Sequence, residues 1–156
     1  MFDKQLMLSD DQAIAGAAGT FVSTNKIDVR GGTPGFTTDT LGNTAENDPG
    51  KSNGLDVLFV VTEQFAGGDS VNAQIGYDDS AAFGSPTILQ TTGAIPIATL
   101  KPGYQFRLSL PPGRAAADIY LGAQYVTLGA GAMSAGKISA FVIARGEKPT
   151  SAGAFL

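Results

Sequence analysis

The chain has 156 residues with 10 lysines and arginines, 14 aspartates and glutamates, a net charge of -4, and neither histidine nor cysteine. This length fits one domain that builds its core without disulfides. The missing residue types exclude a thiol nucleophile, a Ser–His pair, a Cys/His zinc site and His-ligated iron or copper. The acidic balance and the scattered basic residues argue against a nucleic-acid partner. No apolar stretch is long enough to span a bilayer.

The start of the chain carries apolar side chains among charged and polar ones. Its large apolar residues are Phe2, Leu6, Met7 and Leu8. We interpret residues 1–12 as an N-terminal arm. The competing interpretation is a short Ala-rich helix that a capping box at residues 9–12 opens and Gly19 ends. The segment lacks the basic and apolar regions of a secretory signal, so we expect synthesis in the cytoplasm.

Short strands separated by Gly and Pro turns fill most of the remaining sequence. Residues 55–64 form a continuous apolar run, typical of a strand buried on both faces. Residues 71–77 alternate apolar and polar, as a strand with one solvated face does. The other expected strands are 27–29, 87–91, 95–100, 104–110, 119–128 and 138–144, and residues 129–136 are expected to form a flexible turn. The pattern predicts an all-β, jelly-roll-like sandwich of about eight antiparallel strands in one domain, residues 1–156.

Two segments outside the strands are candidates for contact with a partner. Residues 30–53 are rich in turn formers and long for a plain connection, which is typical of functional loops. The acidic and amide residues of this loop do not match an EF-hand, and we interpret them as turn formers. Residues 147–156 are expected to form a C-terminal tail. The candidate contact residues of the loop and the tail are Arg30, Phe36, Phe155 and Leu156.

The apolar residues near both ends of the chain allow two interpretations. They close one end of this domain's own sandwich, or they pack on a neighbouring subunit.

Carboxylate pairs are the remaining catalytic candidates. Asp56 and Glu63 lie seven residues apart on one expected strand, which separates them by more than about 20 Å and, by simple alternation, places them on opposite faces. Asp78 and Asp79 are adjacent after a strand and indicate a turn. Neither pair fits the two facing carboxylates that a glycosidase needs. The sequence therefore predicts a protein that is not an enzyme and binds no cofactor and no catalytic metal.

Several segments of the sequence resemble the capsid cement, or decoration, proteins of tailed bacteriophages. They are MFDKQLMLSDDQAI, STNKIDV, VNAQIGYDDSAAF, IPIATLKPGYQFRLSLP and YVTLGAGAMSAGKISAFVI, in this order along the chain. Each segment is a strand with a turn and is weakly specific by itself, whereas their order and the start of the chain are more distinctive. Residues 30–53 match the family least well.

The resemblance implies a jelly-roll protein on the outer capsid surface of the virion. Its partner would be the major capsid protein of the phage head, whose capsomers it would bridge as a homo-oligomer, with a dimer favoured. The resemblance implies no cofactor and no catalytic residues.

A carbohydrate- or receptor-binding sandwich on the virion surface is the alternative function, because one fold hosts many functions. Its aromatic platform would have to come from Tyr77, Tyr104, Tyr120 and Tyr125. We interpret these tyrosines as residues at the edge of the core.

Overall fold

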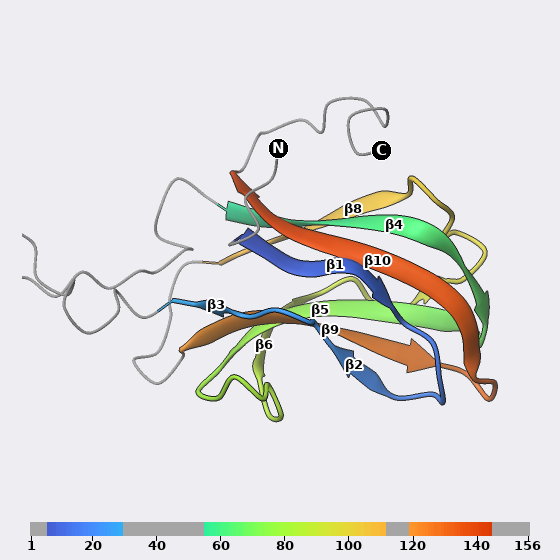
Figure 1. The fold of residues 1–156 in the computed structure, drawn as a ribbon, viewed down its shortest axis with the longest axis horizontal. Coiled ribbons are helices and arrows are strands. Elements are labelled where there is room, and N and C mark those ends of the chain that lie inside the picture. The colour runs from blue at the N-terminus through green and yellow to red at the C-terminus, as the bar shows by residue number, and fades with distance from the viewer. Residues whose placement is uncertain (1–5, 30–54, 112–118, 145–156) are drawn as a thin grey trace, which may run out of the picture.

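The computed structural model describes residues 6–29, 55–111 and 119–144, which form two packed antiparallel sheets (Figure 1). The four-stranded sheet has the order β1 (Met7–Ala13), β10 (Met133–Ala144), β4 (Leu55–Gly67) and β8 (Gln105–Ser109). The other sheet has the order β2 (Thr20–Val22), β9 (Tyr120–Leu128), β5 (Ser70–Asp78) and β6 (Thr87–Thr91). Two short strands extend this sheet: β3 (Ile27–Asp28) pairs with β9, and β7 (Ile95–Pro96) pairs with β5.

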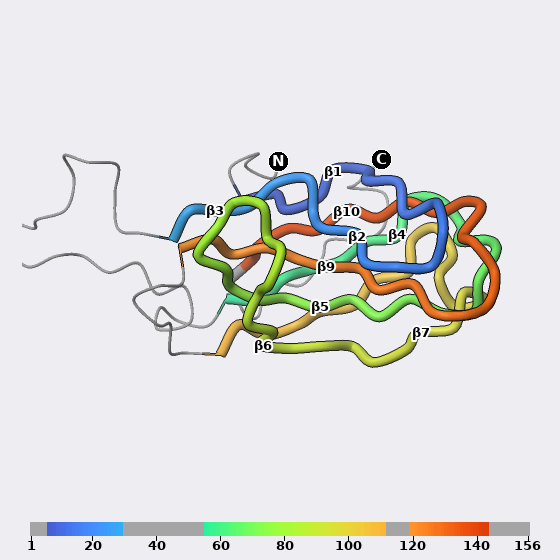
Figure 2. Tube along the Cα trace, turned by 90° about the horizontal axis from the view of Figure 1, so that it is seen from below, coloured from blue at the N-terminus to red at the C-terminus, as the bar shows by residue number. Residues whose placement is uncertain are grey.

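The connections between the strands are those of a jelly roll. Strands β2 and β3 follow one another along the same side of β9, and β6 and β7 do so along β5, so each pair counts as one interrupted strand. Eight strands then remain, four in each sheet. Every connection crosses between the sheets except that from β5 to β6, whose strands are neighbours. Figure 2 shows the second sheet from below, with β9 beside β5 and β2 on the other side of β9. The predicted all-β sandwich is confirmed.

The core lies between the sheets and follows the apolar periodicity of the strands. Val71, Ala73, Ile75 and Tyr77 of β5 are all buried, as their alternation predicts. Aromatic rings fill the centre. The Phe59 ring stacks on Phe106 with centroids 4.8 Å apart and meets the Tyr125 ring edge-on at 6.1 Å. Such a close-packed interior makes the sandwich stiff.

The start of the chain differs from the predicted arm. Residues 7–13 form β1, which pairs with β10, and the described residues contain neither the arm over residues 7–12 nor the alternative helix. Leu8 and Ile14 are fully buried in the core, and the Leu8 carbonyl accepts a hydrogen bond from the Asn25 N–H at 2.8 Å. Burial of these two side chains stabilises the pairing of residues 7–13 with the sheet. The local sequence pattern does not reveal this burial.

Two further segments correct the predicted strand boundaries. Residues 133–136 were expected in a turn, but they belong to β10 and pair with the end of β4 through register shifts. Gly136 has a φ of +139°, and a Cβ there would lie 2.5 Å from a ring atom of Phe65, so a glycine allows the strand to continue. Residues 97–100 were expected to continue a strand, but they form turns. The Thr99 N–H donates to the Pro96 carbonyl and the Leu100 N–H donates to the Ile97 carbonyl.

Candidate functional site

The outer face of the four-stranded sheet carries two distinct groups of side chains. Along β4, Val57, Phe59 and Val61 face the core, so Leu58 and Val60 point the opposite way. We call the first group the outer apolar patch; it consists of Met7, Leu58, Val60, Phe141 and Ile143. We call the second group the polar cluster; it consists of Asp11, Thr62, Glu63, Lys137 and Ser139.

The outer apolar patch spans three neighbouring strands. Phe141 of β10 pairs with Leu58 of β4 on one side and with Met7 of β1 on the other. Leu58, Val60, Phe141 and Ile143 are between 1% and 7% exposed. In an antiparallel sandwich the face turned away from the core is usually polar. An apolar group at this place therefore indicates a surface that another segment or molecule covers.

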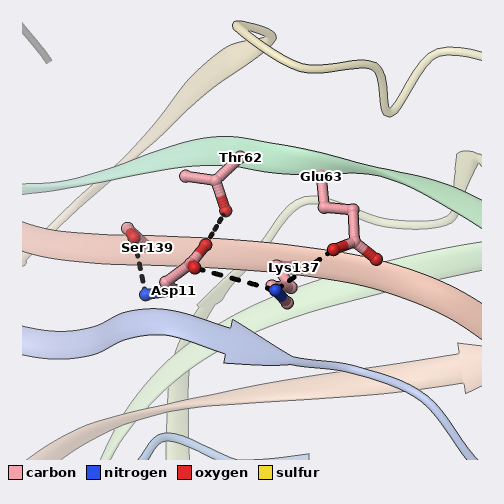
Figure 3. Close-up of polar contacts among 5 residues, drawn as sticks. All are labelled: Asp11, Thr62, Glu63, Lys137 and Ser139. Atoms are coloured by element: carbon pink, nitrogen blue, oxygen red, sulfur yellow. Dashed lines mark hydrogen bonds and ion pairs between the residues drawn. The ribbon is translucent and has the colours of Figure 1, made fainter. Parts of the chain in front are cut away.

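The polar cluster ties the edge strand β1 to its neighbours (Figure 3). The Lys137 ammonium lies 3.2 Å from a Glu63 carboxylate oxygen and 3.8 Å from one of Asp11. The Thr62 hydroxyl donates to the Asp11 carboxylate, and the Asp11 N–H donates to the Ser139 hydroxyl oxygen at 2.8 Å. The hydrogen bond to Glu63 and the two negative charges raise the pKa of Lys137. Lys137 thus lies between carboxylates of the two strands that flank β10.

A β-bulge in β4 explains how the polar cluster forms. Lys137 pairs with Glu63, but the next residue, Ile138, pairs with Val61, which leaves Thr62 as the extra residue. The bulge brings Thr62 and Glu63 to the same outer face, so the expectation that Asp56 and Glu63 face opposite sides is wrong. Their separation along the strand still prevents joint catalysis.

The candidate contact residues fall into three groups. Leu6 is 44% exposed just before β1, and Met7 packs on the outer apolar patch. Leu8 was expected to contact a partner, which is wrong, because its side chain is fully buried in the core. The remaining candidates, Phe2, Arg30, Phe36, Phe155 and Leu156, lie outside the described residues.

The sequence interpretation missed Leu58, Val60, Phe141 and Ile143 as a surface group. The available signal was the uninterrupted apolar runs at residues 57–61 and 140–143, which predict burial on both faces of a strand.

The Asp78 carboxylate organises a loop, as the turn interpretation predicted. It accepts hydrogen bonds from the N–H groups of Ser80 at 2.9 Å and Ser85 at 3.1 Å. These bonds, the one from Ser80 foremost, lower the pKa of Asp78 despite the opposing effect of burial. Within residues 6–29, 55–111 and 119–144, no three acidic side chains gather in a way that could hold a metal ion.

Two of the four tyrosines are unsuited to a carbohydrate platform. Tyr77 is 1% exposed and Tyr125 is fully buried. The Tyr125 hydroxyl lies 2.8 Å from the Ser9 hydroxyl, and burial raises its pKa. The Tyr104 ring packs 6.0 Å from Phe106 at the edge of the core. A sugar-binding site would have to form without the two buried rings.

The match to a known protein family covers most of the chain. A family model described as Bbp16 matches residues 8–142, which run from the first strand of the sandwich into the last. No curated protein matches the chain. The described part of the chain contains no helix that is long and apolar enough to cross a membrane.

Proposed function

The chain belongs to the Bbp16 family, a phage-associated family, and from this premise we propose that it is a virion structural protein that decorates an icosahedral phage head. It bridges capsomers of the major capsid protein on the outer capsid surface and so stabilises the shell. The observation that carries this proposal is the family match over a complete jelly-roll sandwich. The resemblance of the sequence to capsid cement proteins supports the finer assignment.

The physical requirements of a cement protein agree with this structure. A ligand that binds only the intact, expanded shell stabilises that state by mass action. Individual contacts can be modest, because linked copies bind with a high effective concentration. A close-packed sandwich transmits force between capsomers without deforming.

Leu6 is the described residue best placed to contact the shell. It is one of three large apolar side chains that are exposed among the described residues, at 44%. It immediately precedes Met7, which packs on the outer apolar patch. We propose that Leu6, together with Phe2, inserts into the major capsid protein while β1 stays in its own sheet.

Co-sedimentation with undecorated, expanded heads tests the proposal. The wild-type protein is expected to bind saturably at symmetry-related sites, which imaging of the pellet would locate. Leu6→Asp is expected to weaken binding at least tenfold. Leu128→Asp is the matched control, because Leu128 is 42% exposed at the end of β9, and it should bind as the wild type does. Absence of binding by the wild type would refute the cement function, and equal binding of both variants would refute the role of Leu6.

We also propose that the protein acts as a homodimer, which would let one assembly contact two capsomers. Analytical ultracentrifugation at micromolar concentration is expected to give twice the monomer mass. A strictly monomeric protein would contradict the dimer while leaving the binding assay to decide the cement function.

A further inference from the structure

The two sides of the sandwich differ in the strands that form them. One side consists of β1 together with β2 and β3, and we call it the β1–β3 flank. The opposite side consists of β8 together with β6 and β7, and we call it the β6–β8 flank. Figure 2 shows β1 and β3 along one side and β6 and β7 along the other. Within the described ranges no strand pairs with the far side of β6, β7 or β8, so these edges can meet another chain.

Hydrogen bonds between the two sheets close the β1–β3 flank. The Asn25 N–H donates to the Leu8 carbonyl at 2.8 Å. The Gln12 side-chain amide, on β1, donates to the Val22 carbonyl of β2, also at 2.8 Å. Polar groups of this flank are thus satisfied inside the molecule, which leaves them little to offer a partner.

The β6–β8 flank instead carries apolar side chains that the chain itself covers only in part. They pack on the edge of the core and are Leu89, Ile95, Ile97, Tyr104 and Phe106. Four of the five residues of β6 are exposed. Ile88 of β6 is 39% exposed and is one of the three exposed large apolar side chains among the described residues. A partner that covers these side chains removes apolar surface from water, which favours association.

The charge and hydrogen-bonding chemistry of this flank fits a second copy of the chain. Residues 80–100 contain no charged side chain. Lys101 lies in the loop before β8, and Arg107 of β8 lies on the outer face of its sheet because it pairs with Leu58. Two chains that each carry a net charge of -4 avoid like-charge contacts by meeting through an uncharged surface. The hydroxyl and amide groups of β6 both donate and accept, so they can pair with their own copies across a two-fold axis.

The position of the β6–β8 flank also agrees with the proposed shell contact. Leu6 immediately precedes β1, and β1 and β8 are the opposite edges of the four-stranded sheet. Two copies that meet through their β6–β8 flanks therefore keep both Leu6 side chains at the far sides of the dimer. Eight strands spaced about 4.8 Å apart place these two edges at least about 30 Å from each other. Such a dimer presents two separate contact sites, as bridging of two capsomers requires.

We propose that two copies of the chain meet about a two-fold axis through their β6–β8 flanks. The inference rests on the proposed homodimer and identifies its interface. A β-bulge at Leu89 and Pro96 in β7 oppose a continuous sheet across the two copies, so the contact consists mainly of side-chain packing. The outer apolar patch is the weaker candidate for this contact, because its side chains on β4 and β10 are already no more than 7% exposed.

Analytical ultracentrifugation of charge variants tests the proposal. Ile88→Asp brings two carboxylates toward each other across the axis and is expected to weaken the dimer about tenfold or more. Leu128→Asp is the matched control, because Leu128 is 42% exposed on the same sheet but lies at the end of the central strand β9. The control and Leu6→Asp should both remain dimeric. Circular dichroism and thermal melting check that each variant is folded.

Chemical cross-linking is a second measurement and needs only conservative substitutions. The chain has no cysteine, so a single introduced thiol is unique. Ile88→Cys treated with a short bifunctional maleimide is expected to give covalent dimers about tenfold faster than Leu128→Cys, because the dimer raises the effective concentration of the facing thiols. The two thiols replace side chains of nearly equal exposure, 39% and 42%, so a difference in rate reports proximity between copies.

The outcomes separate this interface from the proposed function. A dimer that persists in Ile88→Asp, together with equal cross-linking of the two cysteine variants, would overturn the interface while leaving the dimer in place. Loss of the dimer in Leu6→Asp or in Leu128→Asp would assign the contact to another surface and overturn the proposal as well. A monomeric wild-type protein would remove the dimer and its interface together, and co-sedimentation with phage heads would still decide the cement function.

Discussion

Replacement of Leu8 by alanine tests whether β1 is an integral strand of the sandwich. The Leu8 side chain is 0% exposed and belongs to the core between the sheets. Truncation of a fully buried leucine removes its apolar contacts and leaves a cavity, which typically costs about 2–5 kcal/mol in the free energy of unfolding. For a chain of this length, about 3 kcal/mol corresponds to a fall in the melting temperature of roughly 6–12 °C.

Equilibrium unfolding in urea, followed by circular dichroism, measures this change. Leu6→Ala is the matched control, because Leu6 is two residues away and 44% exposed. We expect the control to change the free energy of unfolding by less than about 0.5 kcal/mol. If Leu8→Ala were as mild as its control, β1 would contribute little to the folded state. The N-terminal segment would then be a detachable arm, contrary to our reasoning.

Three further predictions concern stability. Gly136→Ala should lower the free energy of unfolding in urea by about 1–3 kcal/mol, because the alanine Cβ would overlap the Phe65 ring in the core. Gly103→Ala is the control: Gly103 also has a positive φ but has open space around it, so the loss of unfolding free energy should be smaller. Tyr125→Phe should cost about 1 kcal/mol in the same assay through loss of the hydrogen bond to Ser9, and an unchanged midpoint would contradict that bond. The lowered pKa of Asp78 stabilises the folded state above the ordinary carboxyl pKa of 3.8, and this contribution is lost as the pH falls through the folded-state value. Asp78→Asn should therefore flatten the fall of the melting temperature below about pH 4, and an unaltered acid limb would refute the assignment.

Local periodicity allowed much of the fold to be predicted. The alternation of residues 71–77 gave the buried face of β5, and the apolar run at residues 55–64 gave a strand buried on both sides. The expected turn after that run forms at Gly67 and Gly68, both with positive φ. These features depend on side-chain period and on backbone freedom, which neighbouring residues encode by themselves.

The candidate site was less predictable, because it depends on contacts between distant segments. The bulge at Thr62 exists only in the pairing of β4 with β10, and it changes the face on which Glu63 lies. Asp11 joins the polar cluster only because β1 lies beside β10, more than 120 residues later in the chain. No local pattern encodes such a register.

The amino-acid sequence by itself determined the all-β class, the positions of the main strands and the exclusion of histidine and cysteine chemistry. The tertiary structure decided that Leu8 lies in the core and that Leu58 and Phe141 share an outer patch. The reason is physical. Strand formation follows from the local pattern, whereas the assignment of an apolar side chain to the core or to an outer face depends on which distant strand it packs against.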